Sequence, residues 1–300
     1  MLAGVMLGCV WLQVAELQRS IEFYQRLGFR VGLLQPPVAI LTSSDTNNAL
    51  ILLWERPGTR PRPPRTVGLY HVAFCLPSED DLAAFLAYAL RVGIPLDGAS
   101  DHWVSAAVYL TDPDGNGIEI YADRPKETWR SAEGKIRMET YPLDVGALLR
   151  EAQQPWLEMP VGTRVGHVHF RVASLEEAEE FLSDVVGLAV TSRQYLGARF
   201  FAADGYHHHV ATNTWASSTA LPPNDAAGLR LWSIGVGNQV EWYAVGARLR
   251  RSQDAIHVGE SWLLLRDPWG SLLLIAERSM LPVTPEAVLR MFNQLREVLP

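Results

Sequence analysis

Asp112-Pro113-Asp114-Gly115-Asn116-Gly117-Ile118-Glu119-Ile120-Tyr121 is the segment around which the chain is organised. Its Asp-Pro and Asp-Gly pairs are typical of a tight turn, and the Ile-Glu-Ile alternation that follows has the period-two spacing of a β-strand. Glu119 therefore points to the opposite face of the sheet from Ile118 and Ile120. A carboxylate on that face must be solvated, paired or bound to a metal ion. The stretch thus predicts a turn that leads into a strand, and it makes Glu119 a candidate functional residue.

The elements expected around this strand follow one repeated order: a strand, a helix and then further strands. A strand over 7–14 precedes a helix over 16–27, and a strand over 69–76 precedes a helix over 78–92. In the second half, a strand over 166–172 precedes a helix over 175–185, and a strand from 229 precedes a helix over 239–250. Further strands are expected at 29–34, 39–42, 49–54, 107–110, 117–121, 206–214, 262–265 and 271–276, with helix-like pieces at 145–151 and 285–298.

The two halves of the chain look duplicated. Val14-Ala15-Glu16-Leu17 corresponds to Val172-Ala173-Ser174-Leu175, and Asp112-Pro113-Asp114-Gly115 corresponds to Asp267-Pro268-Trp269-Gly270. Similarity at a long internal period indicates repeated structural units. We therefore predict an α+β protein of four βαβββ modules in two domains, residues 1–125 and 164–300, joined by a linker over 126–163.

Composition excludes several classes of function. The chain has 300 residues, 48% of them hydrophobic, a net charge of −7 and a pI near 5.6. An acidic surface disfavours nucleic acids and anionic membranes as partners. No apolar run reaches the ~18 residues of a membrane-spanning helix, and residues 1–11 lack the features of a secretory signal. We expect a cytoplasmic protein, in which the two cysteines, Cys9 and Cys75, are small buried residues without a disulfide or zinc spacing.

Two of the eight histidines occupy equivalent positions. His71 opens the first strand of the second module and His167 opens that of the third, while Glu119 lies on the last strand of the second module. Two imidazoles and one carboxylate can fill one face of an octahedral ion, as in the facial triad of non-haem Fe(II) oxygenases. A lone histidine at the start of a strand is more often structural, so the hypothesis depends on the equivalence. His169 shares a strand face with His167 and is an alternative ligand.

The helix starts quoted above, together with the stretch from Tyr109 to Tyr121, resemble the vicinal oxygen chelate superfamily of glyoxalases, bleomycin-resistance proteins and extradiol dioxygenases. Within it the chain is most similar to two-domain extradiol dioxygenases of the catechol 2,3-dioxygenase type. The narrower match is carried by Gly68-Leu69-Tyr70-His71, the segment from Asp101-His102 to Tyr109, Gly205-Tyr206-His207-His208-His209 and Asn213-Thr214-Trp215. The resemblance covers residues 5–277 and implies two glyoxalase-like domains of curved mixed sheets.

The resemblance also implies a site. Its metal ligands fall on His71, Glu119 and His167, with Fe(II) or Mn(II) as the ion. The acid-base histidine of the family, on the last strand of its module, is best matched by His208, and His209 remains an alternative. Second-sphere roles fall on Tyr109, ten residues before the glutamate, and on His102, whose gap to the tyrosine is shorter than usual. The implied substrates are an aromatic diol of the catechol type and O₂, with ring opening beside the diol.

One departure from the family pattern concerns the modules that carry the ligands. The family places all three in the last two modules, but here the fourth module has Leu231 and Leu274 at the ligand positions, and the first has Cys9. The second module must therefore face the third, with the first and fourth as a metal-free support. This pairing can occur within one chain or across a dimer, so homo-oligomerisation stays open.

Two other classes of function share these modules. A glyoxalase-type isomerase or thiol transferase would require a fourth protein ligand, for which His208 or His209 is available. A metal-free binding protein of the bleomycin-resistance kind would leave the histidines incidental. A surface tract is a separate alternative for His207–His209, because three consecutive residues on a strand cannot all face inward. Four tryptophans either line a pocket or pack in the core: Trp103, Trp215, Trp232 and Trp269.

Overall fold

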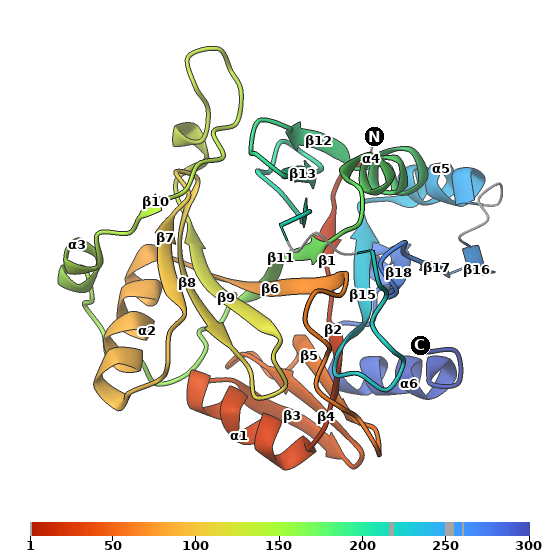
Figure 1. Ribbon diagram of the computed structural model, residues 1–300, viewed down its shortest axis with the longest axis horizontal. Coiled ribbons are helices and arrows are strands. Elements are labelled where there is room, and N and C mark those ends of the chain that lie inside the picture. Colours follow the sequence, from red (N-terminus) through yellow and green to blue (C-terminus); the bar gives the residue numbers. More distant parts are fainter. Residues whose placement is uncertain (1, 216–218, 250–254, 260) are drawn as a thin grey trace.

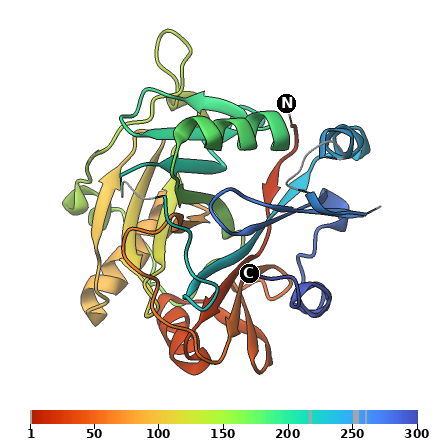
Figure 2. The same ribbon diagram turned by 45° about the vertical axis from the view of Figure 1, so that its right-hand side comes forward.

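The computed structural model describes residues 2–215, 219–249, 255–259 and 261–300, and within them the strands form two mixed sheets of nine strands each (Figures 1 and 2). Sheet I contains β1 (Met6–Leu7), β2 (Val10–Val14), β3 (Arg30–Gln35), β4 (Val38–Thr42), β5 (Ala49–Glu55), β15 (Gly228–Val236), β16 (Ala255–Val258), β17 (Trp262–Arg266) and β18 (Leu272–Glu277). Sheet II contains β6 (Gly68–Leu76), β7 (Gly98–Asp101), β8 (Ser105–Thr111), β9 (Gly117–Asp123), β10 (Tyr141–Pro142), β11 (Arg164–Arg171), β12 (Ala189–Ser192), β13 (Ala198–Ala202) and β14 (Val210–Asn213).

Each half of the chain contributes one module to each sheet. Sheet I has the order β16-β17-β18-β15-β2-β5-β4-β3, with β1 paired to β15, and so joins the first module to the fourth. Sheet II has the order β10-β7-β8-β9-β6-β11-β14-β13-β12, in which the antiparallel pair of β6 and β11 joins the second module to the third. The predicted four-module α+β architecture is confirmed, and the facing of modules two and three occurs within one chain. The domain boundaries at 125 and 164 stay a prediction.

The helices begin and end where the sequence supplies capping residues. Ser78 and Thr284 accept hydrogen bonds from backbone N–H groups in the first turns of their helices, and Gly28 ends the first helix with a φ of 105°, which favours glycine. The expected helix end at Arg250 lies outside the described residues. The helices are α1 (Leu17–Leu27), α2 (Glu79–Val92), α3 (Val145–Arg150), α4 (Leu175–Glu179) continued by a π-helix (Glu180–Val186), α5 (Gln239–Leu249) and α6 (Pro285–Leu295), with 3₁₀ turns at Lys126–Thr128 and Arg278–Met280. None of the described helices is long and apolar enough to cross a membrane.

Alternation along the strands divides each sheet into two faces. In sheet I, Val10 and Leu12 belong to the main hydrophobic core with α1, whereas Trp11 points to the other face and packs with α6. In sheet II, Val72 and Phe74 belong to the same main core, whose members also include residues of α2. That core therefore spans both sheets. The face of sheet II turned away from it carries the polar side chains described next.

Candidate active site

Three side chains from neighbouring strands of sheet II converge on one point. His71 comes from β6, Glu119 from β9 and His167 from β11, and all three are buried. Nε2 of His71 lies 3.0 Å from Oε2 of Glu119, and Nε2 of His167 lies 3.2 Å from the same oxygen. The two Nε2 atoms are 3.3 Å apart. Within the described part of the chain, this is the one group of three or more His, Cys, Asp or Glu residues that could hold a metal ion.

Strand register explains this convergence. Ala73 on β6 lies opposite Glu119 on β9 and opposite His167 on β11, and residues opposite each other in a sheet point to the same face. His71 is two residues before Ala73 and shares that face as well. The turn at 112–117 sets the position of Glu119, since Asp112 Oδ1 accepts hydrogen bonds from the backbone N–H groups of the turn before β9 begins.

Two glycines allow the strands to approach each other beside the triad. A Cβ atom on Gly117 would clash with the carbonyl oxygen of Tyr70, the residue before His71. A Cβ atom on Gly166 would clash with the Tyr121 hydroxyl, next to His167. Any larger residue at these positions would push β9 or Tyr121 away from the metal-ligand candidates.

The charges of the triad suit a cation. Burial alone would raise the pKa of Glu119, but the facing imidazoles of His167 and His71 outweigh it and hold that pKa well below its usual range. Burial lowers the pKa of His167 to about 4, although Glu119 opposes the change. An ionised carboxylate therefore faces a neutral imidazole that has a lone pair to share.

These donor atoms fit a divalent ion. Three ligands on one face of an octahedral ion with bonds of ~2.1 Å lie ~3.0 Å apart, close to the distances found here. Two histidines and one carboxylate are also the ligand set of facial-triad sites. A metal-binding histidine usually donates its second ring N–H to a partner, but Nδ1 of His167 has none among the described residues. Its orientation depends instead on ring packing, with the His208 ring centroid at 4.1 Å.

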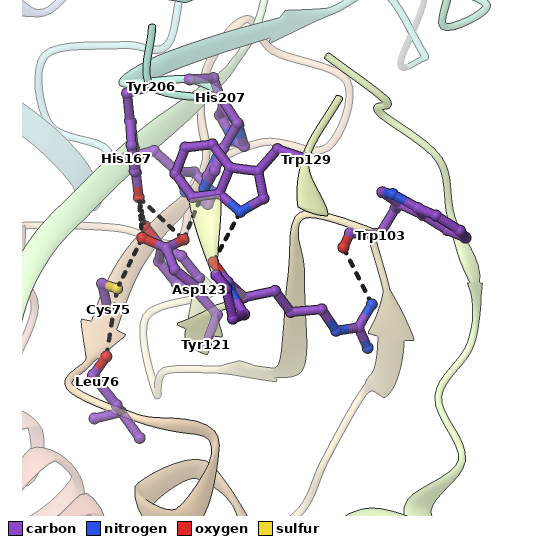
Figure 3. A network of polar contacts seen from close by, with 12 residues as sticks. Cys75, Leu76, Trp103, Tyr121, Asp123, Trp129, His167, Tyr206 and His207 are labelled. Carbon is purple, nitrogen blue, oxygen red and sulfur yellow. Dashed lines mark hydrogen bonds and ion pairs between the residues drawn. The ribbon is translucent and has the colours of Figure 1, made fainter. Parts of the chain in front are cut away.

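His208 is connected to a buried carboxylate through His207. Nδ1 of His208 lies 2.8 Å from Nδ1 of His207. Nε2 of His207 lies 2.7 Å from Oδ1 of Asp123, and Figure 3 shows these two residues. Burial would raise the pKa of Asp123, but His207 and Arg164 hold it below its usual value, so the carboxylate is ionised and only accepts hydrogen bonds. The Tyr206 hydroxyl donates to the same carboxylate at 2.9 Å.

The histidine run differs from the sequence prediction. We expected His207–His209 within a strand over 206–214, but β14 begins at Val210, and the three histidines lie in an irregular segment before it. All three are nevertheless buried, because an unpleated segment need not alternate its side chains between two faces. The surface-tract alternative is therefore wrong. His208 lines the cavity described below, whereas Nδ1 of His209 accepts a hydrogen bond from the backbone of Ala203.

Tyr109 and His102 form a pair beside Glu119. Tyr109 on β8 lies directly opposite Glu119 on β9. Its hydroxyl is 2.5 Å from Nε2 of His102, whose Nδ1 is 3.0 Å from the carbonyl oxygen of Glu139. Burial, followed by the charge of Glu119, raises the pKa of Tyr109 well above its usual value, so the phenol keeps its proton.

A cavity of about 490 Å³ connects these groups. Its lining includes the triad, the pair of Tyr109 and His102, His208 and an aromatic wall of Tyr70, Tyr195, Phe200 and Trp215. His169 also lines the cavity, but one of its ring nitrogens, Nε2, lies 2.9 Å from the side-chain amide of Asn213 and is not part of the converging triad. Of the other tryptophans, Trp232 and Trp269 are buried in the core, and Trp103 stacks against the Arg137 guanidinium 3.4 Å from its ring centroid.

Sequence reasoning missed Asp123, His207 and two arginines that line the cavity, Arg62 and Arg171. The signal for Asp123 was present, because it follows Glu119 by four residues on one strand and must share its face. The signal for Arg171 was the same, since His167 and His169 precede it at period two on β11. No comparable signal identifies Arg62, which lies in a connection between strands.

Comparisons with known proteins agree with this geometry. A sequence model of the Glyoxalase/Bleomycin resistance protein/Dioxygenase superfamily matches residues 6–120. The chain is 39% identical over 269 residues to catechol-2,3-dioxygenase of Bacillus subtilis (strain 168), covering 87% of this chain and 93% of that protein. It is 32% identical over 114 residues to biphenyl-2,3-diol 1,2-dioxygenase 3 of Rhodococcus globerulus, covering 37% of this chain and 60% of the relative.

Solved structures support the fold alone. A Bacillus subtilis structure superimposes with a TM-score of 0.61 at 11% identity, covering 91% of this chain and 85% of that one. Glyoxalase I from Zea mays superimposes with a TM-score of 0.54 at 14% identity, covering 97% of this chain and 96% of that one. The alignment with the Bacillus subtilis catechol-2,3-dioxygenase covers most of both sequences. The chain belongs to the glyoxalase/bleomycin resistance protein/dioxygenase superfamily and, within it, to the family of catechol-2,3-dioxygenase.

Proposed function

We propose that this chain is an extradiol ring-cleaving dioxygenase, which uses a non-haem divalent metal ion to insert O₂ into an aromatic diol of the catechol type. The observation that carries the proposal is the convergence of His71, Glu119 and His167 at 3.0–3.3 Å in the wall of a cavity of about 490 Å³, which has room for an aromatic ring. The identity to a catechol-2,3-dioxygenase over most of the chain supports the same activity.

His71, Glu119 and His167 would hold the ion, which we propose to be Fe(II) or Mn(II). When bound, the ion would lower the pKa of a coordinated diol hydroxyl and leave positions for substrate and O₂ beside each other. Two neutral imidazoles and one carboxylate leave a divalent ion with a net charge near +1, which favours an anionic diol. The surrounding aromatic wall excludes water and orients the ring against the triad.

We propose His208 as the group that moves the diol proton, with Asp123 and His207 as positioning residues. The ionised Asp123 carboxylate accepts the Nε2–H of His207, which leaves Nδ1 of a neutral His207 to accept the Nδ1–H of His208. Nε2 of His208 then carries a free lone pair and can act as a base. This chain of hydrogen bonds fixes the ring tautomer in the manner of a carboxylate behind a catalytic histidine.

We propose that His102 and Tyr109 stabilise the charge that develops on the ring oxygens. Their 2.5 Å contact lies at the wall of the cavity next to Glu119, where a hydrogen bond is stronger than in water. When Nε2–H of His102 donates to the Tyr109 oxygen and the Thr140 hydroxyl donates to Nδ1 of His102, the Tyr109 proton is free to be donated to an oxygen of the substrate.

The isomerase alternative receives less support. It would require a fourth protein ligand, but neither His208 nor His209 joins the group of three among the described residues. The metal-free alternative would leave a buried carboxylate facing two imidazoles without a role.

The decisive experiment is reconstitution. Protein stripped of metal, then supplied anaerobically with Fe(II) or Mn(II), should bind one equivalent and, on addition of catechol and air, consume one O₂ per catechol while forming the yellow ring-opened semialdehyde. Oxygen uptake by His167→Ala protein, or a product opened between the two hydroxyl carbons, would contradict the proposal.

A further inference from the structure

Two arginines form a cationic end to the active-site cavity. Arg62 and Arg171 both line it, and neither forms an ion pair with any described residue. One Nη of Arg62 donates to the carbonyl oxygen of Leu69 at 2.5 Å. The guanidinium carbon of Arg171 lies 4.8 Å from the centroid of the Tyr70 ring. Each guanidinium therefore keeps donors to spare.

This end of the cavity lies close to the metal-ligand candidates. Arg171 follows His167 and His169 at period two on β11, so the three side chains share one face. The Tyr70 ring, against which Arg171 packs, is 5.1 Å from the His71 ring. One aromatic ring thus separates the guanidinium from the triad, a distance that a short side chain on a bound diol can span.

The two positive charges are not balanced from within the cavity. Burial and the nearby charge of Arg171, opposed by Asp112, lower the pKa of Arg62 to about 10, so Arg62 remains cationic at neutral pH. Asp112 is buried within the turn before β9, and its carboxylate already accepts hydrogen bonds from Tyr24 and Asn116. An anion between the guanidinium groups would offset their repulsion.

The remaining carboxylates of the cavity have other partners. Glu119 faces the two histidines of the triad, Asp97 accepts a bond from the Thr111 hydroxyl, and Glu139 pairs with Arg137. A cavity of about 490 Å³ also falls within the ~300–1,000 Å³ range of pockets that hold ligands larger than a single ring.

We propose that the substrate is a catechol that carries a carboxylate on a short side chain, held by Arg62 and Arg171. This inference rests on the proposed dioxygenase function and adds the substrate class. Two guanidinium groups can bind a carboxylate through charge-assisted, bidentate hydrogen bonds, which fixes the ring orientation as well as the affinity.

The test compares an acid with its neutral ester. 3-(2,3-Dihydroxyphenyl)propionate and 3,4-dihydroxyphenylacetate, each beside its methyl ester, are titrated under anaerobic conditions while tryptophan fluorescence is followed, because Trp215 lines the cavity. Wild-type protein should bind at least one of the acids about 10- to 100-fold more tightly than its ester, and kcat/KM in air should show the same ratio. Equal binding of acid and ester in both pairs would overturn the inference.

Matched variants assign the preference to the arginines. Arg171→Met and Arg62→Met should each bring the acid-to-ester ratio close to one, and Arg171→Lys should retain part of it. Arg290→Met, which removes an exposed charge on α6 outside the cavity, should leave the ratio as in wild type. An acid preference that survives both cavity variants would contradict the assignment.

Failure of the two proposals can be told apart. If catechol is cleaved but acids and esters bind alike, only the substrate class is wrong. If no diol is cleaved under any metal while the acids still bind in an arginine-dependent way, the dioxygenase function is wrong and the anion subsite stands.

Discussion

Sheets I and II are each built from two βαβββ modules, one from each half of the chain, yet they use the face turned away from the main core in different ways. In sheet II, the side chains of His71, Glu119 and His167 on that face line a cavity. In sheet I the corresponding positions are occupied by Leu231, Leu274 and Cys9, in the same order. All three belong to a second hydrophobic cluster.

Helix α6 fills the space that remains open in sheet II. Its Phe292 packs against Trp11 at a centroid distance of 5.7 Å and against Trp54 at 5.5 Å, in the same cluster as Val288 and Leu295. The helix is amphipathic, and its apolar side covers this face of sheet I. Figure 1 shows α6 near the C-terminal end of the chain. In this molecule the paired modules therefore form a site where polar residues occupy the inner positions and no helix covers them, as in sheet II.

The largest effect is expected from removing a ligand candidate in sheet II. Glu119→Gln removes the negative charge that the two imidazoles face, so the protein should no longer bind one equivalent of metal. The value of kcat/KM should fall at least about 10³-fold, since an active-site metal ion stabilises the transition state by several kcal/mol. Metal analysis and oxygen uptake measure both losses.

The counterpart in sheet I is the control for that result. Leu274→Ala should cost about 2–5 kcal/mol of unfolding free energy through the cavity it creates, with metal content kept at one equivalent. Loss of metal in this variant would show that the two sheets are not independent.

A smaller effect, on the free energy of unfolding, is expected from placing a carboxylate at position 274 of sheet I, the counterpart of Glu119 in sheet II. Leu274→Glu buries an unpaired charge among apolar residues of the cluster under α6, which should lower the free energy of unfolding by about 3 kcal/mol in urea titrations. Leu274→Met, of similar volume, should cost less than about 1.5 kcal/mol. Wild-type stability of Leu274→Glu would mean that this face admits water or a cation.

Local pattern in the sequence predicts much of this contrast. The alternation Ile118-Glu119-Ile120 places the carboxylate opposite the core, and the structure buries both isoleucines. The absence of ligands at Cys9, Leu231 and Leu274 predicts which modules must face each other. The face of Glu119 and the pairing of the modules can both be predicted, because strand alternation is a local pattern and module repetition is a periodic one.

What the sequence does not predict depends on contacts between distant segments. Asp123 and His207 are 84 residues apart, and their contact needs the irregular path of the segment before β14. Amphipathicity shows that α6 covers an apolar surface, but not which of the two sheets provides it. Arg62 reaches the cavity from a proline-rich connection whose course no periodicity describes.

An intermediate effect is expected from Asp123, which has no acidic counterpart in sheet I because Arg278 occupies the equivalent position. Asp123→Asn can donate to Nε2 of His207, which reverses the tautomers of His207 and His208 and removes the free lone pair at Nε2 of His208. We expect kcat to fall about 10- to 100-fold, with KM for catechol and metal content unchanged.

Steady-state kinetics separate this positioning role from a structural one. Asp123→Glu keeps an acceptor and should recover part of kcat, whereas a merely structural defect would lower thermal stability in both variants. An unchanged kcat in Asp123→Asn would refute the tautomer assignment.

The smallest effect concerns the turn that precedes the last strand of each pair of modules, where Asp267 in sheet I corresponds to Asp112 in sheet II. Burial raises the pKa of Asp267 to about 8 despite hydrogen bonds from Trp232 and Ser271. The native state then binds a proton that the unfolded chain releases near pH 4, so the free energy of unfolding falls as pH rises toward 8. Between pH 7 and 8, above the titration of unfolded histidines, the loss should be about 1 kcal/mol.

Asp267→Asn isolates this contribution, because the amide cannot titrate. The variant should lose about 1 kcal/mol at every pH through the weakened bond to Trp232, but the decline that wild type shows between pH 7 and 8 should disappear. Urea titrations at half-unit pH intervals measure the difference. If the unfolding free energies of wild type and variant run parallel between pH 7 and 8, Asp267 is ionised in the native state. Its hydrogen bonds from the Trp232 side chain and the Ser271 backbone then stabilise a buried anion instead of a neutral acid.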